Sequence, residues 1–162
     1  SGYASKSQQE TAFKQAGQTL ERFYNDAVQS TPPAYVEREF ELKIADNIYL
    51  HGRMDVVFED SEGAEIRDYK TGDSVNDEKK AKQKAQASQQ LTLYALAWQI
   101  EHGIIPRVSL QFPDTDMIAS IAKRQQSLDS IKLKLINAIE DMIKGKFPPS
   151  SNQHDYCIHP EL

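Results

Sequence analysis

The sequence predicts one domain of the α/β (α+β) class, in which helices flank a mixed sheet. Apolar residues recur every three or four positions in some segments, as in amphipathic helices, and alternate with a period near two in others, as in strands. The segments follow the order helix, three strands, helix, strand, strand, helix. A strand that follows a meander and a helix returns to the sheet by a right-handed crossover, which makes the sheet mixed.

The first half of the chain is expected to form a helix and a three-stranded meander. The helix runs from Gln8 to Val28 and stops at "STPP", because proline cannot continue the helical hydrogen-bond ladder. Strands follow at "YVEREFELKI", "IYLHGRMDVVFE" and "AEIRDYK". The first two form a hairpin around Asp46 and Asn47, with a loop longer than these two residues, because a two-residue turn would pair apolar with polar positions.

The second half is expected to add a helix, two strands and a final helix. Helical spacing extends from Val75 to His102, and Gly103 ends this helix. "RVSLQF" and "MIASIAK" have the character of strands. The apolar positions of the final helix are Leu128, Ile131, Leu135, Ala138 and Met142, and Gly145 and Pro148 end it.

Composition and length limit the classes of protein that remain. A chain of 162 residues, 39% hydrophobic and 27% charged, suits one soluble globular domain. We expect that domain over residues 1–162, with a core over about 8–149 and a tail over 150–162, cut from a longer protein. No apolar run is long enough for a membrane span. The lone Cys157 and the lack of a visible signal peptide favour the cytoplasm.

Two acidic residues are predicted to face each other across the second hairpin. The alternation places Met54 on the core face of its strand, and Asp55 and Val57 on the polar face with Glu37 of the preceding strand.

The turn between these strands sets their register. A loop over residues 60–63 sets Asp55 opposite Asp68 and Lys70 beside Arg53.

A cation would explain why two carboxylates face each other. Opposed like charges destabilise a sheet, whereas Mg²⁺ is bound by one or two carboxylates together with water and substrate phosphates. Asp55 and Asp68 could hold such an ion, and Lys70 could stabilise charge on a phosphate or orient a water molecule. The alternative is an ordinary edge strand with solvated charges. The net charge of −5 argues against a diffuse basic surface for nucleic acid, but not against this site.

Four segments resemble the RecB-like branch of the PD-(D/E)XK nuclease superfamily. The segments "YVEREF", "HGRMD", "EIRDYKTG" and "QQLTLYALAW" are similar to its E-x-x-F strand, G-R-x-D strand, D-Y-K-T-G strand and turn, and Q-x-x-x-Y helix. The resemblance covers about residues 13–149 and implies a restriction-endonuclease-like αβββαβ core. Domains of the branch that this chain resembles are found as stand-alone nucleases and as the C-terminal domains of some UvrD/PcrA-type helicases.

The resemblance implies a Mg²⁺- or Mn²⁺-dependent DNA exonuclease of DNA repair or recombination, with a helicase motor in the same or a partner chain. A second reading is a catalytically inactive nuclease-fold module that binds DNA or scaffolds a helicase. For the nuclease, the resemblance implies that the metal ligands are Asp55, Asp68 and the carbonyl of Tyr69. The catalytic lysine would be Lys70, and Gln90 and Tyr94 would contact the nucleic acid.

The sequence departs from the branch in two ways. Where many members have a histidine four residues after a glycine of the first helix, this chain has Glu21, which is a candidate metal ligand; Glu37 competes with it, and Arg53 is a further site candidate. One cysteine is too few for the four-cysteine iron–sulfur cluster of some members, so no cluster is expected. The tail residues His154, Cys157 and His159 could ligate zinc only with help from elsewhere.

Overall fold

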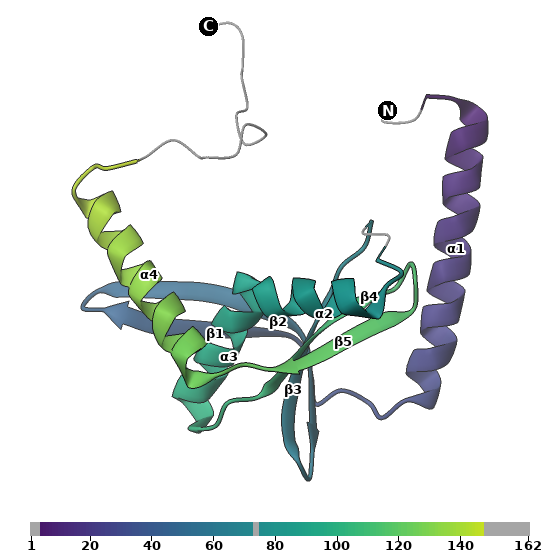
Figure 1. Ribbon diagram of the computed structural model, residues 1–162. Coiled ribbons are helices and arrows are strands. Elements are labelled where there is room, and N and C mark those ends of the chain that lie inside the picture. The colour runs from purple at the N-terminus through teal and green to yellow at the C-terminus, as the bar shows by residue number, and fades with distance from the viewer. Residues whose placement is uncertain (1–3, 73–74, 148–162) are drawn as a thin grey trace, which may run out of the picture.

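The computed structural model describes residues 4–72 and 75–147, and its order of elements is the predicted one except that two helices stand where one was predicted before the fourth strand (Figure 1). None of the helices in these residues is long and apolar enough to cross a membrane. The elements are α1 (Lys6–Gln29), β1 (Tyr35–Ala45), β2 (Ile48–Asp60), β3 (Gly63–Tyr69), α2 (Glu78–Ala87), α3 (Gln89–His102), β4 (Arg107–Phe112), β5 (Met117–Ala122) and α4 (Gln125–Ile143).

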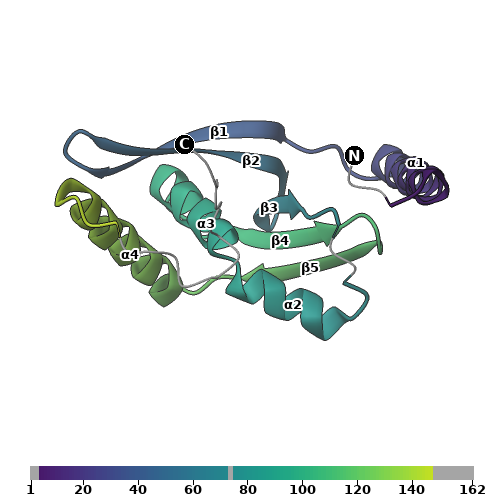
Figure 2. The ribbon, with the colours of Figure 1, turned by 90° about the horizontal axis from the view of Figure 1, so that it is seen from above.

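The five strands form one mixed sheet in the order β1-β2-β3-β4-β5. Only β3 and β4 pair in parallel, and α2 and α3 make the crossover between them. The other neighbours are antiparallel. Figure 2 shows α2, α3 and α4 on the same side of the sheet, whereas α1 stands beside it. The predicted α+β class and mixed sheet are confirmed.

The core lies between the sheet and α3. Seven of the fourteen residues of α3 are buried, which makes it the central helix of the domain. Burying large apolar side chains is the main favourable term in folding, at about 1.5–3 kcal/mol for each Leu, Ile or Phe. The largest apolar side chains with less than 2% exposure are Trp98, Phe112, Met54, Ile66, Leu91, Leu128, Val57 and Val108.

The predicted single helix over residues 75–102 is wrong, because Ser88 divides it into α2 and α3. The backbone of Ser88 is extended, with φ −61° and ψ 115°. Its hydroxyl accepts the Leu91 N–H at 3.2 Å, which is the contact of a helix N-cap. A helix end and a helix start therefore meet at one residue.

The predicted faces of β2 also need correction. Met54 and Val57 are both buried, at 1% and 0% exposure, although strict alternation puts them on opposite faces. The β1–β2 pairing passes from Val36–Val56 to Arg38–Met54 without pairing the residues between them. One of those residues, Glu37, has φ 54°, which non-glycine residues rarely adopt. The alternation therefore breaks beside Asp55.

The hairpin loop between β1 and β2 is shorter than predicted. Ala45 pairs with Ile48, which leaves Asp46 and Asn47 as the turn, and Asn47 has φ 61°. The register shifts between Lys43 and Ala45. This irregularity adds one residue to β1, so the hydrophobic pattern is kept with a two-residue turn.

The amphipathic helix α1 forms as predicted but buries none of its residues. Two contacts with the rest of the fold are a ring contact between Phe23 and Tyr69, with centroids 5.3 Å apart, and a hydrogen bond from Arg22 Nη2 to the Pro113 carbonyl at 2.6 Å. Its apolar side chains that are about two-thirds exposed or more are Phe13, Leu20, Tyr24 and Val28.

We expect Gly52→Ala to destabilise the domain through the ring of Phe40. Phe40 pairs with Gly52 across the hairpin, and a Cβ at Gly52 would overlap the ring. The expected loss is about 1 kcal/mol in urea unfolding, because overpacked side chains must shift. In a Phe40→Ala background the same substitution should be neutral or stabilising, since alanine suits a strand better than glycine.

The matched control for this pair is Gly17→Ala, since nothing lies within 4 Å of a Cβ added there. It should not lower the free energy of unfolding. An equal loss from Gly52→Ala in both backgrounds would contradict the role of the Phe40 ring.

Candidate active site

The candidate site lies where β2 and β3 part. Their ladder pairs Asp60 with Gly63 and continues to Val56 and Arg67, as the predicted register requires. Beyond it, the Tyr69 N–H donates to Asp55 Oδ2 at 3.0 Å. A carboxylate therefore accepts the backbone donor that a strand neighbour would otherwise satisfy.

Asp68 is the buried acid of the site, with 1% exposure. Its Oδ2 lies 2.7 Å from Lys70 Nζ but receives no hydrogen bond of standard geometry. Burial raises the pKa of Asp68; the Lys70 ammonium lowers it, and the Asp55 carboxylate raises it further. The two acids thus act on each other, and one buried oxygen lacks a full set of partners.

Lys70 is held by the first turn of α3. Gln90 Oε1 accepts a hydrogen bond from Lys70 Nζ at 2.8 Å, and Gln90 Nε2 donates to the Tyr94 hydroxyl at 2.7 Å. Gln90 and Tyr94 are four residues apart, so one helix face presents both. The expected neighbour of Lys70, Arg53, instead forms an ion pair with Glu37.

Tyr94 lies at the inner end of this chain of hydrogen bonds. It is 5% exposed, and the Phe40 ring meets it edge-on with centroids 6.0 Å apart. Burial raises the pKa of the Tyr94 phenol; the bond from Gln90 lowers it, and the carboxylates of Asp68, Asp55 and Glu37 raise it. The phenol is therefore protonated at neutral pH.

The turn after Lys70 is tied to the β4–β5 connection. The Lys70 N–H donates to the Gln111 carbonyl at 2.9 Å, which continues the β3–β4 pairing. Gly72, at φ 78°, donates its N–H to Asp114 Oδ2 at 2.8 Å. Asp114 was not predicted as a site residue. The small polar turn "DTD" was its only local signal, since its partner lies 42 residues away.

The two acidic candidates for a third ligand lie in different places. Glu37 Oε2 is 2.6 Å from Arg53 Nε, and the Glu37 carboxylate raises the pKa of the Tyr94 phenol. Glu37 therefore belongs to the edge of the site. Glu21 is an exposed residue of α1. Residues 4–72 and 75–147 contain no group of three or more His, Cys, Asp or Glu placed to hold a metal ion. His154, Cys157 and His159 lie outside the described residues.

The donor set suits a hard divalent cation that keeps part of its water shell. Asp55 and Asp68 offer carboxylate oxygens, and Asp68 Oδ2 is buried beside the Lys70 ammonium with no hydrogen bond of standard geometry. Mg²⁺ typically takes one or two carboxylates and completes its octahedron with water and substrate phosphates. The residues present therefore fit Mg²⁺ or Mn²⁺ without a third acid.

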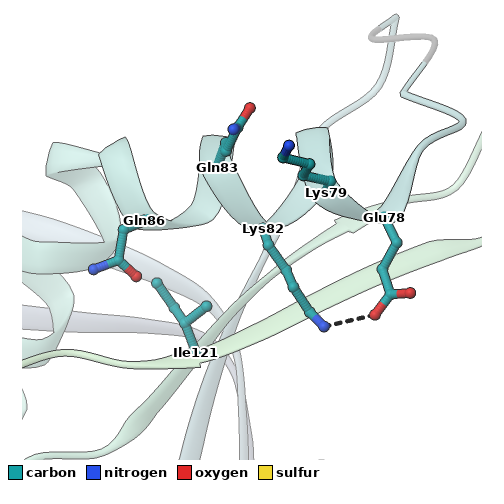
Figure 3. A pocket seen from close by; sticks show the side chains of 6 residues that line it. All are labelled: Glu78, Lys79, Lys82, Gln83, Gln86 and Ile121. Carbon is teal, nitrogen blue, oxygen red and sulfur yellow. Dashed lines mark hydrogen bonds and ion pairs between the residues drawn. The ribbon is translucent and has the colours of Figure 1, made fainter.

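A groove on the surface lies apart from these acids. An open groove of about 630 Å³ runs between α2 and β5, and Figure 3 shows Lys82 in it, bound to Glu78 at 2.6 Å. It shares no lining residue with the acidic site. Its lining residues are Glu78, Lys79, Lys82, Gln83, Gln86 and Ile121.

Comparisons with known proteins indicate the family and agree with the fold. The model of the PD-(D/E)XK nuclease superfamily matches residues 3–161. Among solved structures, a "putative exonuclease" from Eubacterium rectale has a similar fold, with a TM-score of 0.52 and 13% sequence identity. The match covers 93% of this chain and 63% of that one, so this chain spans less than two thirds of that protein. No curated protein gives a significant match.

We expect Asp68→Asn to stabilise the metal-free protein at neutral pH. Because burial raises the pKa of Asp68 in the folded state, the carboxylate opposes folding once it ionises. This penalty is absent below the unfolded value near 3.8 and complete above the folded pKa. The gain from Asp68→Asn should therefore shrink as the pH falls through that window.

Thermal unfolding with EDTA between pH 7 and pH 3.5 measures this effect. The exposed Asp129 of α4 supplies the control, and Asp129→Asn should show no such pH-dependent gain. A lower melting temperature for Asp68→Asn at pH 7 would contradict the burial penalty.

Proposed function

The chain belongs to the PD-(D/E)XK nuclease superfamily, and on that premise we propose that it is a divalent-metal-dependent DNA nuclease of the RecB-like branch. It hydrolyses phosphodiester bonds as an exonuclease in DNA repair or recombination. The observation that carries the proposal is the buried acid Asp68, which lies beside Asp55. The Oδ2 atom of Asp68 contacts the Lys70 ammonium. Such a buried charge lowers the free energy of unfolding, and a bound cation would offset that cost.

We propose that Asp55, Asp68 and the Tyr69 carbonyl hold Mg²⁺ or Mn²⁺. When bound, the ion would supply Lewis-acid chemistry that polarises a phosphate and lowers the pKa of the attacking water. The Tyr69 N–H orients Asp55 through the bond to Oδ2. Among the described residues no third His, Cys, Asp or Glu joins these acids in a metal-holding group, so water and phosphate oxygens would complete the coordination of the ion.

Lys70 carries the charge that the scissile phosphate needs. Its ammonium, bound by Gln90 Oε1, would stabilise negative charge as water attacks phosphorus and the bond to the departing sugar oxygen breaks. Gln90 fixes the position of the ammonium, which lowers the cost of reorganisation in the reaction. The Tyr94 oxygen accepts from Gln90, so its own O–H can donate to the nucleic-acid backbone.

The wider setting of the enzyme is also a proposal. The similar structure from Eubacterium rectale carries the name exonuclease, which supports action from DNA ends. We propose that the domain works with a helicase motor, in the same or a partner chain, in the reducing cytoplasm that its single cysteine suits. No iron–sulfur cluster is proposed, since four cysteine ligands are needed.

We expect Lys70→Ala to lower DNA cleavage by about 100-fold or more, because a charge that stabilises the transition state is lost. The assay compares linear and circular, single- and double-stranded DNA with Mg²⁺ or Mn²⁺. Lys134→Ala removes an exposed lysine of α4 and should leave the rate unchanged. A wild-type protein that binds but never cleaves these substrates would instead be an inactive DNA-binding module.

We expect Glu37→Gln to weaken Mn²⁺ binding by about tenfold, the effect of losing a group that supports metal ligands. Glu37 lies across from Asp55, between the pairs Val36–Val56 and Arg38–Met54, whereas Glu21 is exposed on α1. Titration calorimetry measures the affinity without DNA. Glu21→Gln is the matched control and should bind as the wild type does; weaker binding in Glu21→Gln alone would reverse the assignment.

A further inference from the structure

One buried lysine outside the acidic site has an unusual set of partners. Lys123 directly follows β5 and is 5% exposed. Its Nζ donates to three backbone carbonyls, those of Ala85 at 3.1 Å, Gln86 at 2.9 Å and Ser88 at 3.3 Å. An ammonium has three protons, so these carbonyls use its full donor capacity. Burial lowers the pKa of Lys123.

The three carbonyls belong to the corner between α2 and α3. The last carbonyls of a helix have no partner within that helix, and at this corner the next helix starts after one residue. The Ala85 and Ser88 carbonyls also accept the N–H groups of Ser88 and Thr92, whereas Lys123 donates to all three carbonyls together and its charge suits the negative end of α2. Figure 3 shows Gln86 at this end of α2, above Ile121 of β5. Lys123 thus ties the corner to the end of β5.

The same corner sets the first turn of α3, which carries Gln90. Ser88 accepts the Leu91 N–H with its hydroxyl and the Thr92 N–H with its carbonyl. Gln90 lies between the corner and these bonds, and its side chain holds Lys70 Nζ at 2.8 Å. A shift of the corner relative to the sheet would therefore move Gln90 away from Lys70.

We propose that Lys123 is a positioning residue of the active site, which holds the α2–α3 corner so that Gln90 can orient Lys70. Its kinetic consequence rests on the proposed nuclease function, whereas its effect on Gln90 does not. An apolar residue of similar length would remove the one donor that joins all three corner carbonyls to the end of β5. A displacement of about 1 Å at a catalytic group lowers a rate by up to about 100-fold.

Single-turnover and steady-state DNA cleavage test the kinetic part, with rates expressed per folded molecule. Lys123→Met should lower kcat by about 10- to 100-fold and change KM by about twofold or less, because orientation rather than binding is lost. Lys123→Arg should keep most of the activity, since a guanidinium can donate to the same carbonyls. Lys134→Met is the control for removal of a lysine.

A double-mutant cycle separates positioning from stability. If Lys123 acts through Gln90, Lys123→Met should change kcat by about twofold or less in a Gln90→Ala background. An undiminished loss in that background would overturn the proposal, as would an unchanged kcat in folded Lys123→Met. If Lys123→Met does not fold, Lys123→Gln, which keeps a donor, takes its place with the same expected pattern.

NMR of the protein without metal or DNA tests the structural part. Lys123→Met should shift the side-chain amide signals of Gln90 and speed hydrogen exchange at Leu91 and Thr92, whereas Lys123→Arg should not. Unchanged Gln90 signals would overturn the inference. A wild-type protein that cleaves no DNA would refute the proposed function, and this measurement would then decide the role of Lys123 alone.

Discussion

The candidate site depends on the hydrogen bond from the Tyr69 N–H to Asp55 Oδ2. A buried backbone donor must find an acceptor, and at this point the β2–β3 ladder has ended. Because a side chain accepts it, the strands can part without leaving the donor unsatisfied, and the carboxylate is fixed by the backbone. The left-handed conformation of Glu37 across from Asp55 belongs to the same irregularity. The hydrogen bond that lets β2 and β3 separate is therefore the same one that fixes the position of Asp55.

The crossover helices supply what the sheet lacks. Asp55 within β2 and Asp68 near the end of β3 offer ligands for a hard cation, but in the proposed reaction Lys70 must be held at a set distance from them. That restraint comes from Gln90, at the start of the most buried helix of the fold. Trp98 and Leu91 of α3 are buried in the core, which fixes the position of α3 relative to the sheet. Loop residues alone could not supply that precision, because loops are the more mobile parts of a fold.

Much of the fold could be predicted from the sequence because its signals are local. Periodicity identified most of the elements, and the predicted register of β2 and β3 is confirmed although their turn is residues 61–62 rather than a loop over 60–63, because Asp60 pairs with Gly63. The break at Ser88 was missed because the helical pattern continues through it. Asp114 and Lys123 were missed because their partners lie about 40 residues away, and no local spacing reports such a contact. The position of Glu21 depends on how α1 packs, which periodicity does not determine.

The energetics of the site favour a working enzyme over an inactive relic. The carboxylate of Asp68 is buried, has a raised pKa and is repelled by Asp55, so its ionisation at neutral pH is expected to lower the stability of the fold. Asparagine at this position would relieve the penalty without changing the size of the side chain. A module that only bound DNA would gain from that change and lose nothing. Proteins retain such costly groups where function needs them, and binding of a cation would account for two carboxylates placed close together.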